Sequence, residues 1–230
     1  MSDSTVRRYL RGAAENIDTK PFPKMQQINE VNILVEVAST RASDLQPDES
    51  GTPKLQAILE TALMDMISND KAQDAVIAQN EAQRRSMWAR REAAAEITVG
   101  FPGAVDTDVA VPLEAVPSFL KQITARVQKI DPEGYEFYLS HLGDGNLHYT
   151  FYPSDRSGRL KEPITEAIED VVLGLQGSFS AEHGIGLSKR NSMARRKDPV
   201  ALEMMQAIKT ALDPKNLMNP GKVYPEPEAR

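Results

Sequence analysis

Two alternating segments joined by Asp144-Gly145 constrain the fold more than any other feature of this sequence. They read YEFYLSHL and NLHYTFYP, and in both of them apolar or aromatic side chains recur at every second position. Alternation with this period is typical of a β-strand, and Asp-Gly between two such strands is a strong signal for a tight hairpin. The sequence therefore predicts an antiparallel pair of strands over residues 135–153.

This hairpin carries two of the three histidines in the chain. If Asp144 and Gly145 are the two loop residues of a type I′ turn, His141 lies directly opposite His148, with Cβ atoms about 5 Å apart. Two imidazoles at that distance can bind one metal ion, whereas the alternative is a structural pair of histidines. A bulged three-residue loop would shift the register and remove the direct opposition.

The remainder of the chain predicts helices interleaved with strands. Helices are expected over 3–15, 55–66, 72–96, 112–130, 160–176 and 189–211, the last broken near Asp198-Pro199, and further strands over 31–39 and 107–111. Because the clearest strand pair is a hairpin, the expected fold class is α+β, an antiparallel sheet with helices packed on it.

Composition excludes several kinds of site and partner. The chain has no cysteine, which removes disulfides and thiol chemistry, and its net charge of −6 argues against nonspecific nucleic-acid binding. The basic residues over 189–197 lack interleaved aromatic residues, so they are interpreted as a solvated helix face. No stretch approaches the ~18 apolar residues of a membrane span, and the N-terminus lacks the apolar core of a secretory signal. A cytoplasmic location is expected.

A second segment, SAEHGIG at residues 180–186, holds the remaining histidine. His183 follows Glu182, and the glycines at 184 and 186 allow unusual backbone dihedrals. Two imidazoles and one carboxylate around a divalent ion leave coordination positions open, as in catalytic sites. The alternative is a Glu-His pair in a surface loop. Since all three histidines lie in glycine-flanked segments beside carboxylates, the sequence favours one shared site.

Three motifs in this order, HLGDGNLH, EHGIG and DPKNLMNPGK, resemble the C-terminal domain of FAD-linked oxidases. That family includes D-lactate, glycolate and D-2-hydroxyglutarate dehydrogenases, within the vanillyl-alcohol-oxidase superfamily. The resemblance covers about residues 20–224. It implies that residues 1–230 form one ferredoxin-like substrate or cap domain, whose enzyme oxidises a D-2-hydroxy acid with FAD. The N-terminal FAD-binding domain is expected to be absent from this chain, which alone would be inactive.

The resemblance also implies roles for individual residues. His141, His148 and Glu182 would be ligands of a divalent metal, zinc or manganese, and His183 would be the base that takes the hydroxyl proton of the substrate. The remaining matches are Arg91 as the clamp on the substrate carboxylate, Asn146 as a lining residue of the same pocket, and Asn219 in the NPGK segment as a residue near the flavin. The alternatives for Arg91 and Asn219 are a helix-surface charge and a plain C-terminal turn.

The chain departs from the family pattern at four positions. Asp106 stands where many members have lysine, Ala95 where many have threonine, and Ser140 and Ala181 where glycines are usual. An acidic side chain in place of the lysine weakens the anion clamp. A lactate-like monocarboxylate is therefore expected as the substrate in preference to 2-hydroxyglutarate.

Two other functions stay open on the sequence alone, a stand-alone metal-dependent hydrolase and a non-catalytic binding module that uses the same His/Glu site. The hydrolase would explain the missing flavin domain but not the Arg91 segment or the NPGK tail. The expected partners are a small 2-hydroxy acid, a flavin domain and an electron acceptor that the sequence does not name. Nucleic acid is not expected as a partner, and self-association as a homodimer is left open.

Overall fold

The computed structural model describes residues 31–49, 51–92 and 103–225. They belong to two compact units, one within residues 2–97 and the other within residues 98–230. The expected helix over 3–15 lies outside the described residues. No helix within the described ranges has the length and apolar character needed to cross a membrane.

The first unit is helical in its described part. Its elements are the short 3-10 helix η1 (Ala42–Leu45), α2 (Lys54–Ser68) and α3 (Glu81–Glu92). The helix expected over 55–66 is confirmed by α2, but the one expected over 72–96 begins only at Glu81. Asn80 sets that start, because its side chain accepts a hydrogen bond from the backbone N–H of Gln83 (3.0 Å), as an N-cap does. Residues 93–96 lie outside the described residues.

The strand expected over 31–39 does not form. The segment has no helix or strand assignment, and its apolar side chains are exposed, including Val31 and Ile33 at 58% and 63%. The β-branched residues that predict this strand favour an extended backbone, but a strand also needs a neighbouring strand with which to form hydrogen bonds. The segment instead contacts α3 through Glu36, which accepts a hydrogen bond from Trp88 and pairs with Arg84 (3.4 Å).

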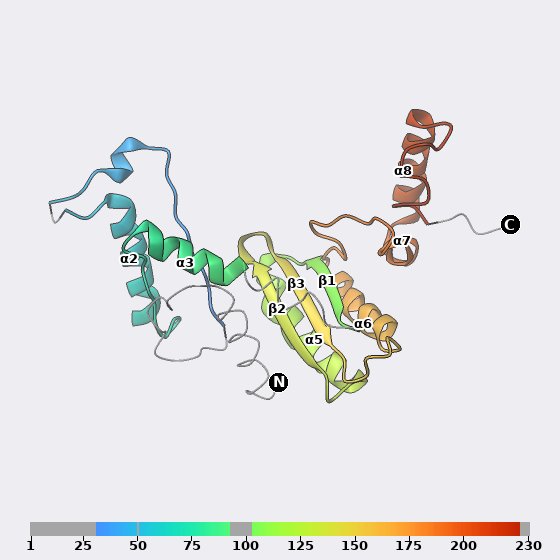
Figure 1. The fold of residues 1–230 in the computed structure, drawn as a ribbon, viewed down its shortest axis with the longest axis horizontal. Helices are drawn as coiled ribbons and strands as arrows, with labels where there is room; N and C mark the ends of the chain where they lie inside the picture. Colours follow the sequence, from blue (N-terminus) through green and yellow to red (C-terminus); the bar gives the residue numbers. More distant parts are fainter. Residues whose placement is uncertain (1–30, 50, 93–102, 226–230) are drawn as a thin grey trace. The chain divides into compact units, whose positions relative to one another are not determined.

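The second unit is built on a three-stranded antiparallel sheet (Figure 1). Its strands are β1 (Val105–Ala110), β2 (Tyr135–His141) and β3 (Asn146–Tyr152), in the order β1-β3-β2. Its helices are η2 (Leu113–Ala115), α5 (Val116–Ile130), η3 (Leu142–Asp144), α6 (Lys161–Gly174), α7 (Arg190–Arg196) and α8 (Pro199–Leu212). The α+β class and the break between α7 and α8 agree with the sequence-based expectation.

One face of the sheet forms the hydrophobic core against α5 and α6. In α5 the buried residues Val116, Phe119, Ile123 and Val127 recur every three or four positions, so they share one side of the helix. They pack with α6 on the strand residues whose side chains point to the same face: Val105, Val109, Leu147, Tyr149 and Phe151. Burial of these side chains fixes which residues of each strand point to the opposite face.

The opposite face carries polar and ionisable residues near the β2–β3 turn. Asp108 lies opposite His148 across the β1–β3 ladder, and Asp106 lies opposite Thr150. Asn146 lies two residues before His148, so it shares this face. The core on one side of the sheet therefore positions a polar row on the other.

The hairpin turn is longer than the sequence predicts. Residues Leu142–Asp144 form η3, and Gly145 closes the turn with a positive φ of 66°. His141 consequently pairs with Asn146, and His148 pairs with Leu139, so the predicted direct opposition of the two histidines is wrong. The shift is an even number of residues, and both histidines stay on the same face as diagonal neighbours.

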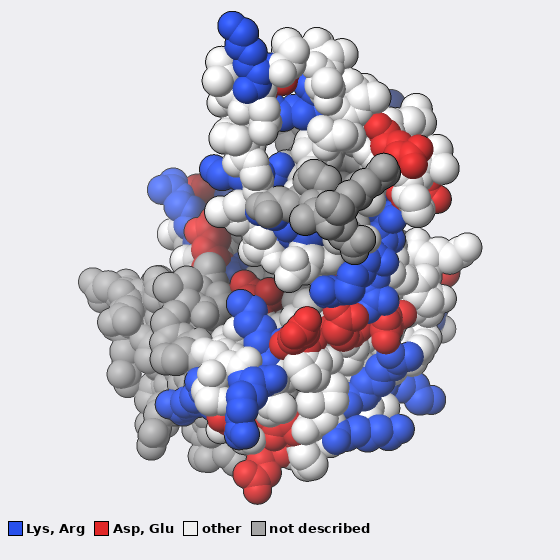
Figure 2. Space-filling view, turned by 90° about the vertical axis from the view of Figure 1, so that its right-hand side faces the viewer, with Lys and Arg blue, Asp and Glu red and all other residues white. Residues whose placement is uncertain are grey.

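The basic segment after residue 189 is ion-paired in the structure. Arg196 pairs with Glu166, with Glu169 (3.3 Å) and with Asp170 (2.8 Å), all on α6. Figure 2 shows acidic and basic side chains next to one another across this side of the molecule. This pairing is unlike the open basic surface that nucleic-acid binding requires.

Candidate functional site

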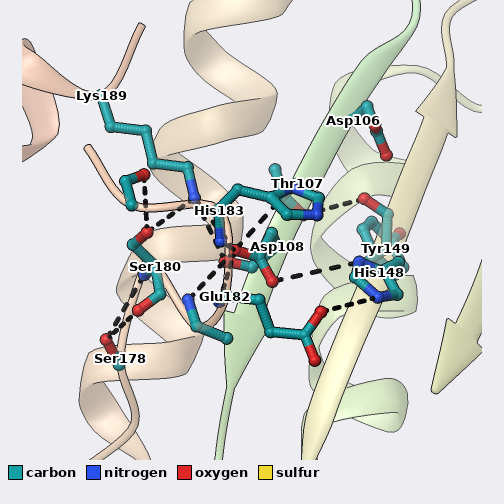
Figure 3. Close-up of polar contacts among 12 residues, drawn as sticks. Asp106, Thr107, Asp108, His148, Tyr149, Ser178, Ser180, Glu182, His183 and Lys189 are labelled. Atoms are coloured by element: carbon teal, nitrogen blue, oxygen red, sulfur yellow. Dashed lines mark hydrogen bonds and ion pairs between the residues drawn. The ribbon is translucent and has the colours of Figure 1, made fainter. Parts of the chain in front are cut away.

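Asp108 is the buried centre of a polar cluster on the sheet. It lies in the middle of β1, its side chain is only 3% exposed, and it faces His148 on β3 (Figure 3). Its Oδ1 atom is 3.9 Å from Nδ1 of His148, and no hydrogen bond to Oδ1 is found among the described residues. A buried carboxylate at this position requires donors or a positive charge nearby.

The loop after α6 supplies those donors. Ser178 forms a two-bond β-bridge with Ala110 at the end of β1 (3.0 and 2.8 Å), which brings the loop to the sheet. The backbone N–H groups of Glu182 and His183 then donate to Oδ2 of Asp108, at 2.9 and 2.8 Å. Two segments more than 70 residues apart in sequence thus meet at one carboxylate oxygen.

Lys189 supplies the positive charge. Its Nζ atom lies 3.4 Å from Oδ2 of Asp108 and donates to Oγ of Ser180 at 2.8 Å. The Lys189 side chain is 19% exposed, so its ammonium is partly removed from water. The Asp108–Lys189 pair therefore balances charge at the base of the cluster.

The other two histidines of the chain both contact the ring of His148. The ring of His183 stacks on His148, with centroids 5.4 Å apart and an interplanar angle of 22°. The ring of His141 approaches His148 edge-on, with centroids 5.6 Å apart. The predicted shared site for the three histidines is consistent with this arrangement, although the hairpin register differs from the predicted one.

Glu182 completes the cluster. Its Oε2 atom lies 3.6 Å from Nε2 of His148, whereas Asp108 approaches the other ring nitrogen, Nδ1. Ligand atoms of Asp108, His148, Glu182 and His183 all lie within 4.8 Å of one another. Imidazole nitrogens and carboxylate oxygens are donors that suit zinc or manganese, so these residues fit a divalent ion.

The surroundings shift the pKa of two members of the cluster. Burial lowers the pKa of His148, the neighbouring carboxylates of Asp108 and Glu182 oppose this effect, and the two other imidazoles add to it. Burial alone would raise the pKa of Asp108, but the N–H groups of His183 and Glu182 and the charge of Lys189 outweigh it and hold that pKa below its ordinary value. These directions favour a neutral imidazole beside an ionised carboxylate.

The three other predicted site residues, Asn146, Asn219 and Arg91, do not belong to this cluster. Asn146 is 2% exposed on the same face, and neither atom of its amide finds a hydrogen-bond partner among the described residues. Asn219 lies in the coil after α8 with a positive φ of 48°. Arg91 lies on α3, in the first unit.

The sequence did not identify Asp108 and Lys189 as site residues. Asp108 lies two residues after Asp106, and Lys189 is one of the basic residues interpreted as a solvated helix face. One signal could have pointed to Asp108, namely an ionisable residue directly before the apolar residues Val109, Ala110 and Val111 of the strand predicted over 107–111. Lys189 carries no comparable signal, because its role depends on a contact that crosses 81 positions of the chain.

Comparisons with known proteins agree on one family. Residues 27–223 match the family described as "FAD linked oxidases, C-terminal domain". D-2-hydroxyglutarate dehydrogenase of Stutzerimonas stutzeri (strain A1501) is 33% identical over 156 residues, which are 66% of this chain and 33% of the relative. The probable mitochondrial D-2-hydroxyglutarate dehydrogenase of Oryza sativa subsp. japonica is 30% identical over 219 residues, 95% of this chain and 36% of the relative.

A relative named for a different substrate also matches. The probable mitochondrial D-lactate dehydrogenase of Danio rerio is 35% identical over 152 residues, 64% of this chain and 30% of the relative. The chain spans about a third of the length of these curated relatives.

Proposed function

The chain belongs to the FAD-linked oxidase C-terminal domain family, and on that premise we propose that it is the substrate- and metal-binding domain of an FAD-dependent dehydrogenase. The enzyme would oxidise a D-2-hydroxy acid to the corresponding 2-oxo acid. The observation that carries the proposal is the convergence of His148, His183, Glu182 and Asp108, with the His141 ring beside them, on one face of the sheet. Family membership favours this function over a stand-alone hydrolase or a binding module.

His148 and Glu182 are the first candidates to hold the ion, and His141 is the proposed third ligand because its ring flanks that of His148. The low pKa of His148 supports this role, since a ligating imidazole must be neutral. When bound, the metal would supply Lewis-acid polarisation of the substrate hydroxyl and the flavin a hydride acceptor.

His183 is the proposed base for the substrate hydroxyl proton. Its side chain is 62% exposed, whereas His148 is 20% exposed, so His183 is accessible to a small molecule above the cluster. Its Nδ1 atom is 3.9 Å from the Asp108 carboxylate, which would stabilise the imidazolium once the proton has been taken. Imidazole suits proton transfer near neutral pH.

Arg91 and Asn146 are the proposed contacts for the substrate. A guanidinium binds a carboxylate through two parallel hydrogen bonds, which would orient the acid group. The buried amide of Asn146 has both a donor and an acceptor available on the polar face of the sheet. Asn146 would help to fix the orientation of the substrate hydroxyl relative to His183, which lies in the same unit.

A flavin domain is the proposed partner of this chain. The matched residues cover only 33% and 36% of these relatives, which leaves room for such a domain. On α8, Val200, Met204, Ile208 and Leu212 recur every four residues and are 58–74% exposed, which supports contact with another protein surface. Asn219 would lie near the flavin in that arrangement.

The electron acceptor, a homodimer and the expected cytoplasmic location stay predictions from the sequence. Two of the three relatives described above carry the word mitochondrial in their names.

Asp106 supports a monocarboxylate substrate. It is exposed on the same face of β1 as Asp108 and accepts a hydrogen bond from Thr150 (2.8 Å). A second carboxylate on the substrate would be repelled by it. In an enzyme that contains this chain and its flavin domain, D-lactate should exceed D-2-hydroxyglutarate in kcat/KM by roughly ten- to hundredfold. Equal or better turnover of the dicarboxylate would contradict the assignment.

Metal content tests the proposed site directly. The chain is stripped with a chelator, reloaded with Zn²⁺ or Mn²⁺, and analysed for bound metal beside His148→Ala, Glu182→Gln and His141→Ala. Wild type should hold about one ion per chain, and the first two variants should lose most of it. Glu162→Gln, an exposed carboxylate on α6, is the matched control and should bind as wild type does. Equal metal content in wild type and His148→Ala would refute the site.

A further inference from the structure

We propose that Asp108 is a positioning residue, which together with Lys189 holds the 180–183 loop so that Glu182 and His183 face His148. The inference deepens the proposed function and rests on it, since it concerns the same cluster. Asp108 would act through the groups that it orients and would not contact the substrate or the metal.

The two ends of the loop are held to the rest of the unit by other contacts. Before the site, Ser178 is bridged to Ala110 of β1. After the site, Ser192 on α7 donates to the buried carboxylate of Glu169 on α6, and Arg196 pairs with the same helix. These contacts bring the loop to the sheet, but none of them involves residues 181–183.

Asp108 holds this middle part. The backbone N–H groups of Glu182 and His183 donate to its Oδ2, and the N–H of Ala181 is shared between Oδ2 (3.2 Å) and the backbone carbonyl of Asp108 (3.1 Å). Three consecutive N–H groups around one anionic oxygen form a concave anion site in the backbone. The side chains of these residues are exposed, so packing contributes little to their placement.

Lys189 makes the burial of Asp108 tolerable and adds a second connection to the loop. Its ammonium approaches Oδ2 of Asp108 and donates to Ser180, the residue just before the three N–H groups. A buried carboxylate without a positive partner would be strongly disfavoured. The pair therefore anchors both the start of the loop and its centre.

The distribution of contacts over the two carboxylate oxygens distinguishes an anchor from a metal ligand. Oδ2 is occupied by the N–H donors and by Lys189, whereas Oδ1 points toward Nδ1 of His148 at 3.9 Å. Glu182 lies near the other nitrogen of that ring, Nε2. At 3.9 Å Oδ1 makes no hydrogen bond to the ring, so the direct bonds of Asp108 go to the loop backbone.

Amide hydrogen exchange of the metal-free 230-residue chain tests the anchoring. In Asp108→Asn, exchange at residues 181–183 should accelerate by about ten- to hundredfold, the ratio expected when charge-assisted hydrogen bonds are lost. Exchange in β2, β3 and α6 should stay at the wild-type rate. Asp106→Asn is the matched control, because it removes a carboxylate two residues away on the same face and should leave the loop unchanged.

Ring-to-ring contacts test the positioning. In the metal-free wild type, the stacked rings of His148 and His183 should show mutual nuclear Overhauser effects, and Asp108→Asn should lose them while Asp106→Asn keeps them. Unchanged loop exchange in Asp108→Asn would overturn the proposal. Faster exchange with intact ring contacts would overturn it as well, because the anchor would then not position the site.

Two further results need their own tests: a general loss of protection in Asp108→Asn, and the absence of metal binding in wild type. If Asp108→Asn also loses protection in the hairpin, Lys189→Met becomes the deciding variant: faster exchange confined to residues 180–183 supports the proposal, and wild-type exchange overturns it. A Zn²⁺ titration separates this inference from the proposed function. Wild type without zinc affinity would refute the metal site but leave both metal-free readouts valid, whereas a positioning role predicts zinc affinity about ten- to hundredfold weaker in Asp108→Asn.

Discussion

The two halves of the candidate site are held in place by different physics. Asp108, Asn146 and His148 lie on β-strands whose other face is packed on α5 and α6, so the hydrophobic core fixes them. Glu182 and His183 lie on a loop with exposed side chains, 47% and 62%, and their backbone is bonded to one carboxylate. The strand half therefore depends on cooperative packing, and the loop half depends on a small number of polar contacts.

This difference suits the proposed roles. The proposed ligand His148 is fixed by the core, the proposed ligand Glu182 depends on its bonds to Asp108, and a base that meets an incoming substrate has to be accessible. His148 is in the rigid half and His183 in the accessible half, yet their rings are stacked 5.4 Å apart. The site thus combines a fixed part and an adjustable part within a few ångströms.

Removal of core volume under the sheet should have the largest effect on stability. Ile168 on α6 is fully buried below the strands, and Ile168→Ala should lower the free energy of unfolding by about 2–5 kcal/mol, through lost burial and an unfilled cavity. Urea unfolding followed by circular dichroism measures this. Leu187→Ala, at a loop residue that is 62% exposed, is the control and should change stability by no more than about 0.5 kcal/mol. Comparable losses of unfolding free energy in Ile168→Ala and Leu187→Ala would contradict the distinction between the two halves.

The β2–β3 turn offers a smaller and more local test of the strand half. Gly145 has a positive φ, and a Cβ atom there would lie 2.1 Å from the carbonyl oxygen of Val111. Gly145→Ala should therefore cost about 1–3 kcal/mol. Gly143→Ala in the same turn is a matched control, because a Cβ atom there meets nothing within 4 Å. Equal melting temperatures for the two variants would mean that the turn does not constrain the sheet.

The same turn shows what could be predicted from the sequence. Alternation placed β2 and β3 correctly and put both histidines on one face, because periodicity follows directly from side-chain direction. The register could not be predicted, since the backbone carbonyl of Gly145 accepts a hydrogen bond from the N–H of Val111, a residue far away in sequence. That contact belongs to the tertiary structure and leaves no local signal beyond the glycine.

The loop half was predicted only in part. The EHGIG motif identified Glu182 and His183 as candidates, but no local pattern indicated that Asp108 would bind their backbone. The wrong strand over 31–39 has a related cause, because β-branched residues predict an extended segment without indicating its partner strand. Local periodicity therefore predicted the strands of the hairpin and the faces of their side chains. Contacts between distant parts of the chain decided the hairpin register, the bonds of Asp108 to the loop and, among the described residues, the absence of a partner strand for residues 31–39.

The smallest expected effect concerns a local version of the loop anchor in the C-terminal coil. Asp213 accepts hydrogen bonds from the N–H groups of Leu217 and Met218, both at 2.9 Å, and pairs with Lys209. Like Asp108, it binds consecutive backbone donors and a lysine, but its partners are only four or five residues away. The hydrogen bond from Lys209, together with those two N–H groups, lowers the pKa of Asp213 to about 2.

A depressed pKa has a defined consequence for stability. The carboxylate of Asp213 contributes stability above the ordinary aspartate pKa of about 3.9, and that contribution is lost as the pH falls from there toward 2. Asp213→Asn should therefore melt below wild type at pH 6, and the gap should shrink as the pH falls from about 4 toward 2, because Asp213 itself becomes protonated there while the other carboxylates titrate alike in both proteins. Thermal melts at several pH values measure the gap, with Lys215→Gln, an exposed residue of the same coil, as the control. A gap that stays constant over this range would show that Asp213 acts through shape and not through charge, unlike the role proposed for Asp108.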